Sequence, residues 1–179
     1  MVIRSIKGLS LLELLATLAS LSVLIGLATP SFMQMMAEQR LRNVSAELRV
    51  SLMTARSEAV KRSEGVSLVK KDSDWSTGWC LEAGTESTCT GQPLQEFRAP
   101  PSSITVALNG VSNGDPLRFN AWGRVPGCPT FALQADAAGA TCKLCLMVAS
   151  DGRVQSTSGD CPTDCNGVSD DMSWSEACS

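Results

Sequence analysis

Apolar residues fill the start of the chain almost without interruption. Between Leu9 and Thr29 the only charged residue is Glu13. A run of about 20 apolar residues is long enough to cross the hydrocarbon core of a bilayer as a helix. Arg4 and Lys7 precede the run and no acidic residue does. The positive-inside rule therefore predicts a cytoplasmic N-terminus and an exported C-terminal part.

The pattern becomes amphipathic after Pro30, which we expect to kink the helix and not to end it. From Ser31 to Glu64, apolar residues recur three or four positions apart, which predicts a helix with one buried face. The recurring positions are Leu41, Val44, Leu48, Leu52, Ala55 and Ala59. Gly65 is predicted to be the C-cap of this helix.

From Gly65 onward the apolar runs are short and are separated by Gly, Pro, Asn and Asp, which predicts a series of short antiparallel strands. The expected strands are Val66–Lys70, Trp75–Ala83, Leu94–Arg98, Ile104–Leu108, Pro116–Asn120, Thr130–Leu133, Lys143–Ala149 and Arg153–Ser156. A long helix followed by strands predicts an α+β fold, with the outer half of the helix packed on an antiparallel sheet. The polar, acidic segment from Thr157 is expected to contain little regular structure.

Composition narrows the possible chemistry. The chain has 179 residues, a formal net charge of -3, no His and no Tyr. Histidine-based acid–base catalysis and histidine metal sites are therefore excluded, and the acidic balance is not that of a general nucleic-acid binder. The sequence contains no nucleophile elbow or phosphate loop, so we expect no enzyme, no catalytic residue and no cofactor. We expect the tryptophans to be core or interface anchors and not ligand platforms; they are Trp75, Trp79, Trp122 and Trp174.

All eight cysteines lie in the part of the chain predicted to be exported: Cys80, Cys89, Cys128, Cys142, Cys145, Cys161, Cys165 and Cys178. An even number of cysteines in an oxidising compartment predicts up to four disulfides. We expect Cys80 to pair with Cys89 across a hairpin, and Cys128 to pair with Cys142 across a loop.

A metal site is the alternative for some of these cysteines. Cys142-x-x-Cys145 and Cys161-x-x-x-Cys165 have roughly the spacing of zinc ribbons. Export from the cytoplasm favours oxidation, so disulfides are preferred and no metal is expected. The tail cysteines, Cys178 included, are then expected to pin the tail to itself or to the sheet.

The N-terminal motif carries a resemblance to a known signal. A short basic leader ends at Gly8, Leu9 follows, and Glu13 is the fifth residue after the glycine. This arrangement resembles the type IV prepilin signal, although Leu9 stands where Phe is usual. The resemblance implies that a prepilin peptidase cuts between Gly8 and Leu9 and methylates the new N-terminus. It also implies that Glu13 is the assembly residue, paired with the α-amino group of Leu9 on this or a neighbouring subunit. An ordinary secretory signal cleaved after Gly26-Leu27-Ala28 is the alternative.

Further motifs extend the resemblance to about residues 8–155. They are Ala55-Arg56-Ser57-Glu58-Ala59 at the helix end, Gly78-Trp79, Gly123-Arg124 and Gly152-Arg153. The set resembles the GspH/FimT group of minor pilins and pseudopilins. The resemblance and the patterns together divide the chain into a leader (1–8), a transmembrane assembly helix (9–29), its amphipathic continuation (30–64), an antiparallel β domain (65–156) and a cysteine-bearing acidic tail (157–179).

The resemblance implies a minor pilin of a type IV pilus, held in the inner membrane and then incorporated in a tip or priming complex. Its partners would be the prepilin peptidase, other minor pilins and the major pilin, with no small-molecule substrate. A GspH-like minor pseudopilin of type II secretion is one alternative, and a signal-anchored exported enzyme is a weaker one. A FimT-like DNA-uptake protein is a third, but such proteins contact phosphate through Gly-Arg-x-Arg. Gln155 replaces the second arginine here, and the tail is acidic, so nucleic-acid binding is not expected.

Overall fold

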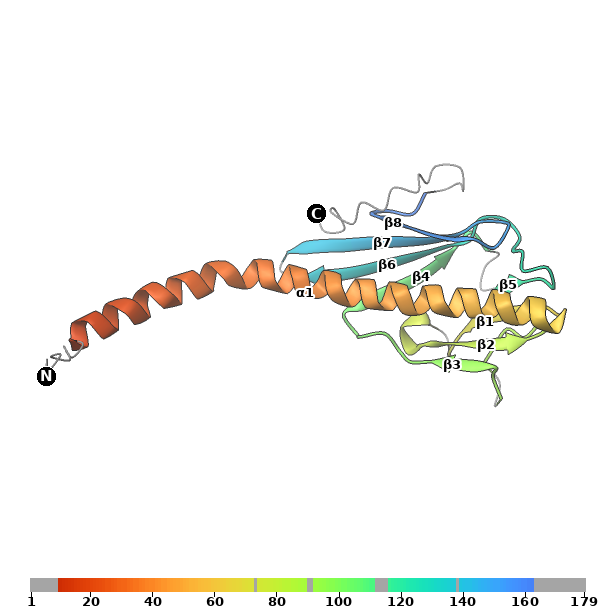
Figure 1. Cartoon of the computed structure of the whole chain (residues 1–179), viewed down its shortest axis with the longest axis horizontal. Helices are drawn as coiled ribbons and strands as arrows, with labels where there is room; N and C mark the ends of the chain where they lie inside the picture. Colours follow the sequence, from red (N-terminus) through yellow and green to blue (C-terminus); the bar gives the residue numbers. More distant parts are fainter. Residues whose placement is uncertain (1–9, 73, 90–91, 112–115, 138, 163–179) are drawn as a thin grey trace, which may run out of the picture.

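The chain folds as one long helix whose C-terminal half carries two antiparallel sheets (Figure 1). The structure is a computed structural model that describes residues 10–72, 74–89, 92–111, 116–137 and 139–162, and the side chain of Pro30 is not included in that description. The elements are α1 (Leu11–Arg62), β1 (Val66–Lys70), the 3₁₀ turn η1 (Trp75–Thr77), β2 (Trp79–Ala83), β3 (Gln95–Phe97), β4 (Ile104–Asn109), β5 (Leu117–Phe119), β6 (Thr130–Ala137), β7 (Ala140–Val148) and β8 (Val154–Ser158). The predicted α+β class, with a long helix on antiparallel strands, is confirmed.

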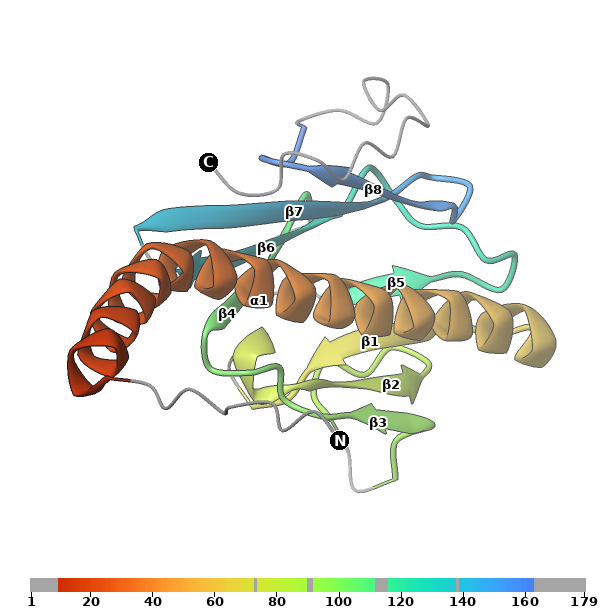
Figure 2. The same cartoon turned by 60° about the vertical axis from the view of Figure 1, so that its left-hand side comes forward.

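Helix α1 has 52 residues and runs through Pro30, which corresponds to roughly 78 Å at 1.5 Å per residue. Proline has no backbone N–H to donate to the Gly26 carbonyl four residues earlier. The helix is bent, and its N-terminal part projects away from the sheets (Figures 1 and 2). The projecting part has no sheet to pack on, whereas the C-terminal part is covered by strands.

The helix ends earlier than the sequence pattern predicted. Ser63, with φ 53°, takes the left-handed conformation at the C-cap, so the assignment of this role to Gly65 was wrong. Gly65 already belongs to the sheet, because its carbonyl accepts a 2.7 Å hydrogen bond from the backbone N–H of Gly84. The chain must therefore change direction between the end of α1 and Gly65, the residue before β1.

Two four-stranded sheets replace the single sheet that we expected. Their strand orders are β3-β2-β1-β5 and β4-β6-β7-β8. The chain changes sheet three times. After β3 it enters the second sheet as β4, whose Ile104 lies opposite Ala135 of β6. It then returns as β5, whose Phe119 lies opposite Val66 of β1, and β6 resumes the second sheet. Both sheets pack on α1 (Figure 2).

Two strand predictions also needed correction. The segment from Trp75 is not the start of a strand but a 3₁₀ turn, capped by the Asp74 carboxylate, which accepts the Ser76 N–H at 3.2 Å. The Trp75 ring then packs edge-on against Phe131, with 5.1 Å between ring centroids. At the other end of the domain, β8 continues to Ser158, two residues into the segment expected to be irregular.

The core lies between the buried face of α1 and both sheets. Its largest fully buried side chains include Leu41, Leu48, Leu52, Trp79, Phe119 and Phe131. The helical members are the positions whose three- and four-residue spacing predicted a buried face. The C-terminal half of α1 is therefore an ordinary core helix.

One polar contact crosses this core, because the indole Nε1 of Trp79 donates to Ser51 Oγ at 3.1 Å. Both residues are fully buried. Removing the hydroxyl in Ser51→Ala leaves the indole N–H unsatisfied, so we expect the free energy of unfolding to fall by about 1–2 kcal/mol. Urea unfolding of the detergent-solubilised protein, followed by tryptophan fluorescence, measures this loss. Ser57→Ala is the control, because that exposed hydroxyl bonds only Thr54 of its own helix, and equal losses in the two variants would contradict the role of Ser51.

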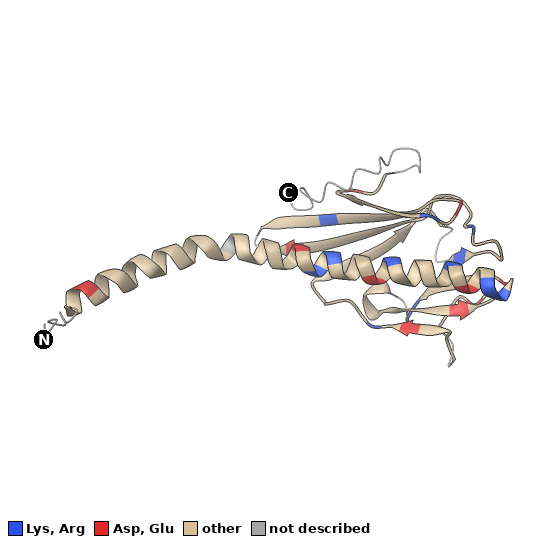
Figure 3. Ribbon diagram, viewed as in Figure 1, with Lys and Arg blue, Asp and Glu red and all other residues tan. Residues whose placement is uncertain are grey.

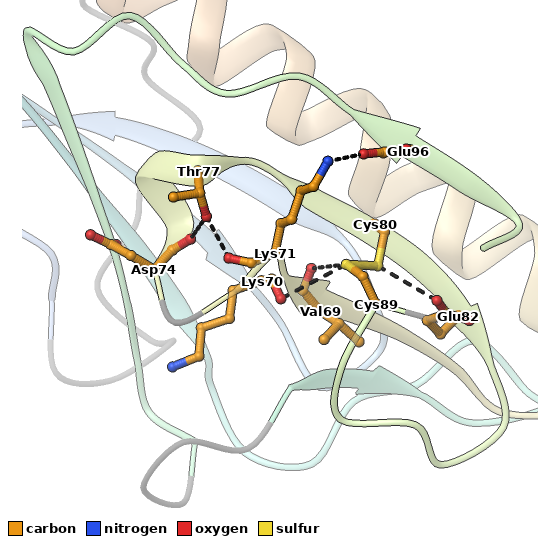
Figure 4. The surroundings of a disulfide bond; sticks show 9 residues. All are labelled: Val69, Lys70, Lys71, Asp74, Thr77, Cys80, Glu82, Cys89 and Glu96. Carbon is orange, nitrogen blue, oxygen red and sulfur yellow. Dashed lines mark hydrogen bonds and ion pairs between the residues drawn. A yellow bond between two sulfur atoms is a disulfide. The ribbon is translucent and has the colours of Figure 1, made fainter. Parts of the chain in front are cut away.

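Disulfides close two of the loops. Cys80 and Cys89 are bonded, as expected, with 6.0 Å between their Cα atoms. The Cys89 sulfur also lies 3.8 Å from the carbonyl oxygens of Val69 and Lys70, so the chain after β2 folds back onto β1 (Figure 4). Near the other end of the domain, Cys145 of β7 is bonded to Cys161 beyond β8.

Cys128 and Cys142 are disulfide-bonded as well, but the predicted bond between them was wrong. Cys142 lies opposite Ala135, whereas Cys128 precedes Thr130 at the other end of β6. The rise along a strand puts them roughly 20 Å apart, and a disulfide needs Cα atoms closer than about 7 Å. Cys165 and Cys178 are outside the described residues.

Candidate functional site

The projecting part of α1, residues 11–36, is apolar and is not covered by the rest of the described chain. None of its apolar window is buried, and the helix is long and apolar enough to cross a membrane. The first buried residue is Ala37. The exposed apolar side chains before it are Leu11, Leu12, Leu14, Leu15, Leu18, Leu21, Val23, Leu24, Ile25, Leu27, Phe32, Met33, Met35 and Met36. A patch of this size is not expected on a free-standing soluble protein and marks a surface for lipid or for other helices.

Charge is almost absent from this projecting part. The charged residues gather on the C-terminal half of α1 and on the sheets (Figure 3). Glu13, in the first turn of α1, is the exception. Its side chain is exposed, and within the described part of the chain it makes no ion pair. A carboxylate inside a bilayer costs about 2.5–3.5 kcal/mol at the midplane and usually faces a partner. Any cation that pairs with Glu13 must come from outside the described residues.

Four hydroxyl groups in the same segment, those of Thr17, Ser20, Ser22 and Thr29, are satisfied within their own helix. Thr17 donates to the Leu14 carbonyl at 2.8 Å, and Ser20 donates to the Ala16 carbonyl at 2.9 Å. The hydroxyl of Thr29 is satisfied in the same way by a carbonyl one turn earlier. Such back-bonding hides a polar group within its own helix. Glu13 therefore differs in kind from its polar neighbours. Gly8 and Leu9, the expected processing residues, lie outside the described residues, so cleavage and methylation stay predictions.

Three of the four motifs of the C-terminal domain meet at one place, whereas the fourth, Gly78-Trp79, lies against the backbone of residues 97–99. A Cβ atom built on Gly152 would lie 2.1 Å from the Gly123 carbonyl oxygen and 2.9 Å from Arg56 Nε. A Cβ built on Gly123 would lie 2.9 Å from Arg56 Cγ. Arg56 Nη2 also donates to the Asp151 carbonyl at 2.9 Å. Arg56 is thus the residue that ties the helix to both Gly-Arg turns. Arg56 lies within the motif at the helix end, but nothing in the local sequence indicates this role.

The second of these turns is held by its own ion pair. The Arg153 N–H donates to Asp151 Oδ1 at 3.0 Å, and Arg153 Nε donates to Asp151 Oδ2 at 2.7 Å. These backbone and side-chain hydrogen bonds hold the pKa of Asp151 below its usual range. Arg153 is therefore already paired with a carboxylate. Arg153 is thus a structural residue of this turn, and the pairing leaves it less available to a phosphate.

The candidate metal ligands are not thiolates. Cys142, Cys145 and Cys161 are all in disulfides, and a disulfide sulfur does not have the charge that binds zinc in a ribbon. In the described ranges there is no cluster of three or more metal-ligating side chains. The four tryptophans differ: Trp75 and Trp79 are buried, Trp122 is 78% exposed, and Trp174 lies outside the described residues.

A helix that is bare and apolar over one half and packed on antiparallel sheets over the other defines a type IV pilin-like protein. The family model described as Type II transport protein GspH matches residues 45–156. That match spans more than half of the chain, and the chain belongs to the GspH family. This is a family of structural pilins, and membership implies a membrane-anchored pilin with other pilins as partners.

Two crystal structures of the minor pilin FimU are similar to this chain. The type IV minor pilin FimU of Pseudomonas aeruginosa (strain PAO1), in one crystal form, has a TM-score of 0.56 at 25% identity over 71% of this chain and 96% of FimU. A second crystal form of FimU gives a TM-score of 0.53 at 26% identity over 69% of this chain and 98% of FimU. The minor pseudopilin EpsH from the Type 2 Secretion System of Vibrio cholerae has a TM-score of 0.49 at 8% identity over 66% of this chain and 96% of EpsH. No curated protein matches the chain in a sequence search.

Proposed function

We propose that this protein is a minor pilin of a type IV pilus that joins a tip or priming complex and helps to start filament assembly. The similarity to the type IV minor pilin FimU supports the assignment to a pilus. The observation that carries the proposal is the bare apolar half of α1 with Glu13 as its one charge. In the bilayer this half is an anchor, and outside the bilayer it needs other helices to cover it.

The proposed sequence of events follows from the N-terminal motif. The precursor inserts in the inner membrane with its leader in the cytoplasm and its β domain outside. A prepilin peptidase cuts between Gly8 and Leu9. The Glu13 carboxylate of one subunit then meets the α-amino group of Leu9 on this or a neighbouring subunit, and that pairing sets the register of the helices. An ion pair removed from water is strong enough to select one register over others.

Electron microscopy of surface filaments tests the pilus assignment. We expect a deletion strain to lose its pili and a complemented strain to regain them.

The match to the Type II transport protein GspH family is the observation that favours a second candidate, a minor pseudopilin of type II secretion. Normal pili together with lost secretion in the deletion strain would replace the first proposal by the second. Normal pili with lost transformation would point instead to DNA uptake, which the Asp151–Arg153 pair and Gln155 disfavour.

The mature N-terminus gives a direct prediction. Mass spectrometry of the protein purified from membranes is expected to find a chain that starts at N-methylated Leu9. The control is a strain without its prepilin peptidase, in which the leader should stay attached. A chain that starts near Thr29 would show an ordinary signal peptidase cut and would contradict the pilin processing.

A further inference from the structure

The outer face of α1 carries a second apolar stripe that nothing in the described chain covers. Opposite the buried face, exposed residues recur at alternating intervals of three and four: Asn43, Ala46, Val50, Met53, Ser57 and Val60. Val50, Met53 and Val60 are 55%, 57% and 51% exposed. This spacing is typical of the face that one helix packs against a partner. The stripe lies outside the segment that would be in the membrane.

Trp122 lies in the first Gly-Arg turn, whose backbone at Gly123 approaches the stripe at Val60. It adjoins Gly123, and a Cβ built on Gly123 would approach Val60 Cγ2 to 3.1 Å. The turn is held by Asn120, whose Oδ1 accepts the N–H of Trp122 at 3.0 Å and that of Arg124 at 2.9 Å. A fixed backbone thus presents a tryptophan that is 78% exposed. Tryptophan in such a setting is the commonest kind of interface anchor.

A groove of about 670 Å³ runs beside the stripe, between α1 and the start of β8. Met53 and Val60 line it, together with Arg49 and Arg56. The other two basic residues of its lining are already paired, Lys61 with Glu58 and Arg153 with Asp151. Within the described residues Arg49 and Arg56 form no ion pair with a carboxylate. The groove therefore combines apolar side chains with two guanidinium groups that have no carboxylate partner among the described residues, although Arg56 Nη2 already donates to the Asp151 carbonyl.

Helix geometry fixes the spacing of these groups. Arg49 and Arg56 are two turns apart, which is about 10 Å along the helix axis. Each lies one turn before an apolar residue of the groove, Met53 and Val60, because residues four apart are neighbours on a helix surface. A complementary surface therefore has two carboxylates about 10 Å apart, with aliphatic or aromatic side chains between them.

We propose that this face, defined by Met53, Val60, Trp122, Arg49 and Arg56, docks the globular domain of a different pilin-type subunit through an acidic, amphipathic segment. The inference rests on the proposed function in assuming that the partner is a pilin. A symmetric dimer through this face would place guanidinium groups against guanidinium groups, which repel. A nucleic acid would need more cations than two and gains nothing from the apolar stripe.

Photo-crosslinking in the full-length, membrane-inserted protein tests this surface. A photoreactive amino acid at position 122 is expected to crosslink to a second pilin-type subunit, at a peptide that contains Asp or Glu next to apolar residues. The same amino acid at exposed Arg98, next to β3 at the opposite edge of the sheet from β5, is the positional control. Arg49→Glu is expected to lower the position-122 yield about tenfold, the size of effect seen for hot-spot residues, while Arg98→Glu should leave it within about twofold.

A charge swap completes the test. Replacing the crosslinked acid of the partner by Lys is expected to restore the yield of Arg49→Glu. In the unlabelled protein, Trp122→Ala should lower co-purification of the partner about tenfold, and Trp122→Phe should retain most of it. Crosslinks to another copy of this chain, to lipid or to nuclease-sensitive material would overturn the proposal, and so would a yield that Arg49→Glu does not change. If Glu13→Ala blocks assembly while the face variants assemble normally, the proposed function stands and this inference fails.

Discussion

Glu13→Ala is expected to leave the protein in the membrane and to remove it from filaments. The substitution makes the projecting helix more apolar, so insertion is not impaired. It also removes the one carboxylate able to pair with the methylated amine of a neighbouring subunit. Hydrogen bonds to charged groups contribute about 1.5–3 kcal/mol, so incorporation should fall by at least about tenfold. The measurement is the amount of the protein in sheared filaments relative to the amount in membranes, by immunoblot.

Two matched variants show whether the effect of Glu13→Ala on incorporation comes from loss of the charge or from a general sensitivity of this segment to substitution. Thr17→Ala removes a polar group one turn further along, but that hydroxyl is bonded to the Leu14 carbonyl of its own helix. It should therefore leave incorporation nearly unchanged. Glu13→Gln keeps the size and the polarity of the side chain but not the charge, so it should behave like Glu13→Ala. If Glu13→Ala enters filaments normally, the assembly role given to Glu13 is wrong.

The long helix could be predicted because its signals are local. The uncharged run before Pro30 and the spacing of Leu41, Leu48 and Leu52 each lie within a few turns of one helix. The strands could be placed for the same reason, since each is a short apolar run between turn residues. The class of the protein followed from motifs at fixed positions, and the family match agrees with it.

The division into two sheets could not be predicted, because it depends on which strands meet. Whether β5 pairs with β1 or with β6 is decided by contacts between segments more than 40 residues apart along the chain (Val66 with Phe119). The pairing of Cys128 failed for the same reason, since strand register sets the distance between two cysteines. The 3₁₀ turn at Trp75 also depends on a distant residue, Phe131, on which the indole ring packs.

The candidate site divides in the same way. Gly8, Leu9 and Glu13 lie in one short motif and could be identified by resemblance. The roles of Arg56 and Trp122 come from tertiary structure. Arg56 contacts two turns that are distant in the sequence, and nothing local distinguishes the exposed Trp122 from the buried Trp79. Sequence patterns identified the anchor, whereas the outer face of the domain could be identified only from the tertiary structure.

Gly152→Ala is expected to destabilise the domain by about 3–4 kcal/mol. Gly152 has φ +82°, and a left-handed conformation costs a non-glycine residue about 1–2 kcal/mol. The new Cβ would also lie 2.1 Å from the Gly123 carbonyl oxygen. That atom belongs to the backbone of a turn tied down by Asn120, so it cannot move aside as a side-chain end would. Overpacking of this kind adds about 1–3 kcal/mol.

Gly139→Ala is the control, because it has the same strain without the collision. Its φ is +84°, and nothing lies within 4 Å of the added Cβ. We expect this variant to lose only about 1–2 kcal/mol in urea unfolding of the detergent-solubilised protein.

Arg56→Ala combined with Gly152→Ala tests which neighbour matters, since a Cβ at Gly152 also approaches Arg56 Nε to 2.9 Å. No rescue is expected, because the Gly123 carbonyl remains in place. Equal losses for Gly139→Ala and Gly152→Ala would mean that the two Gly-Arg turns are not in close contact. Full recovery of stability in the double variant would mean that the added Cβ collides with the Arg56 side chain and not with the Gly123 backbone.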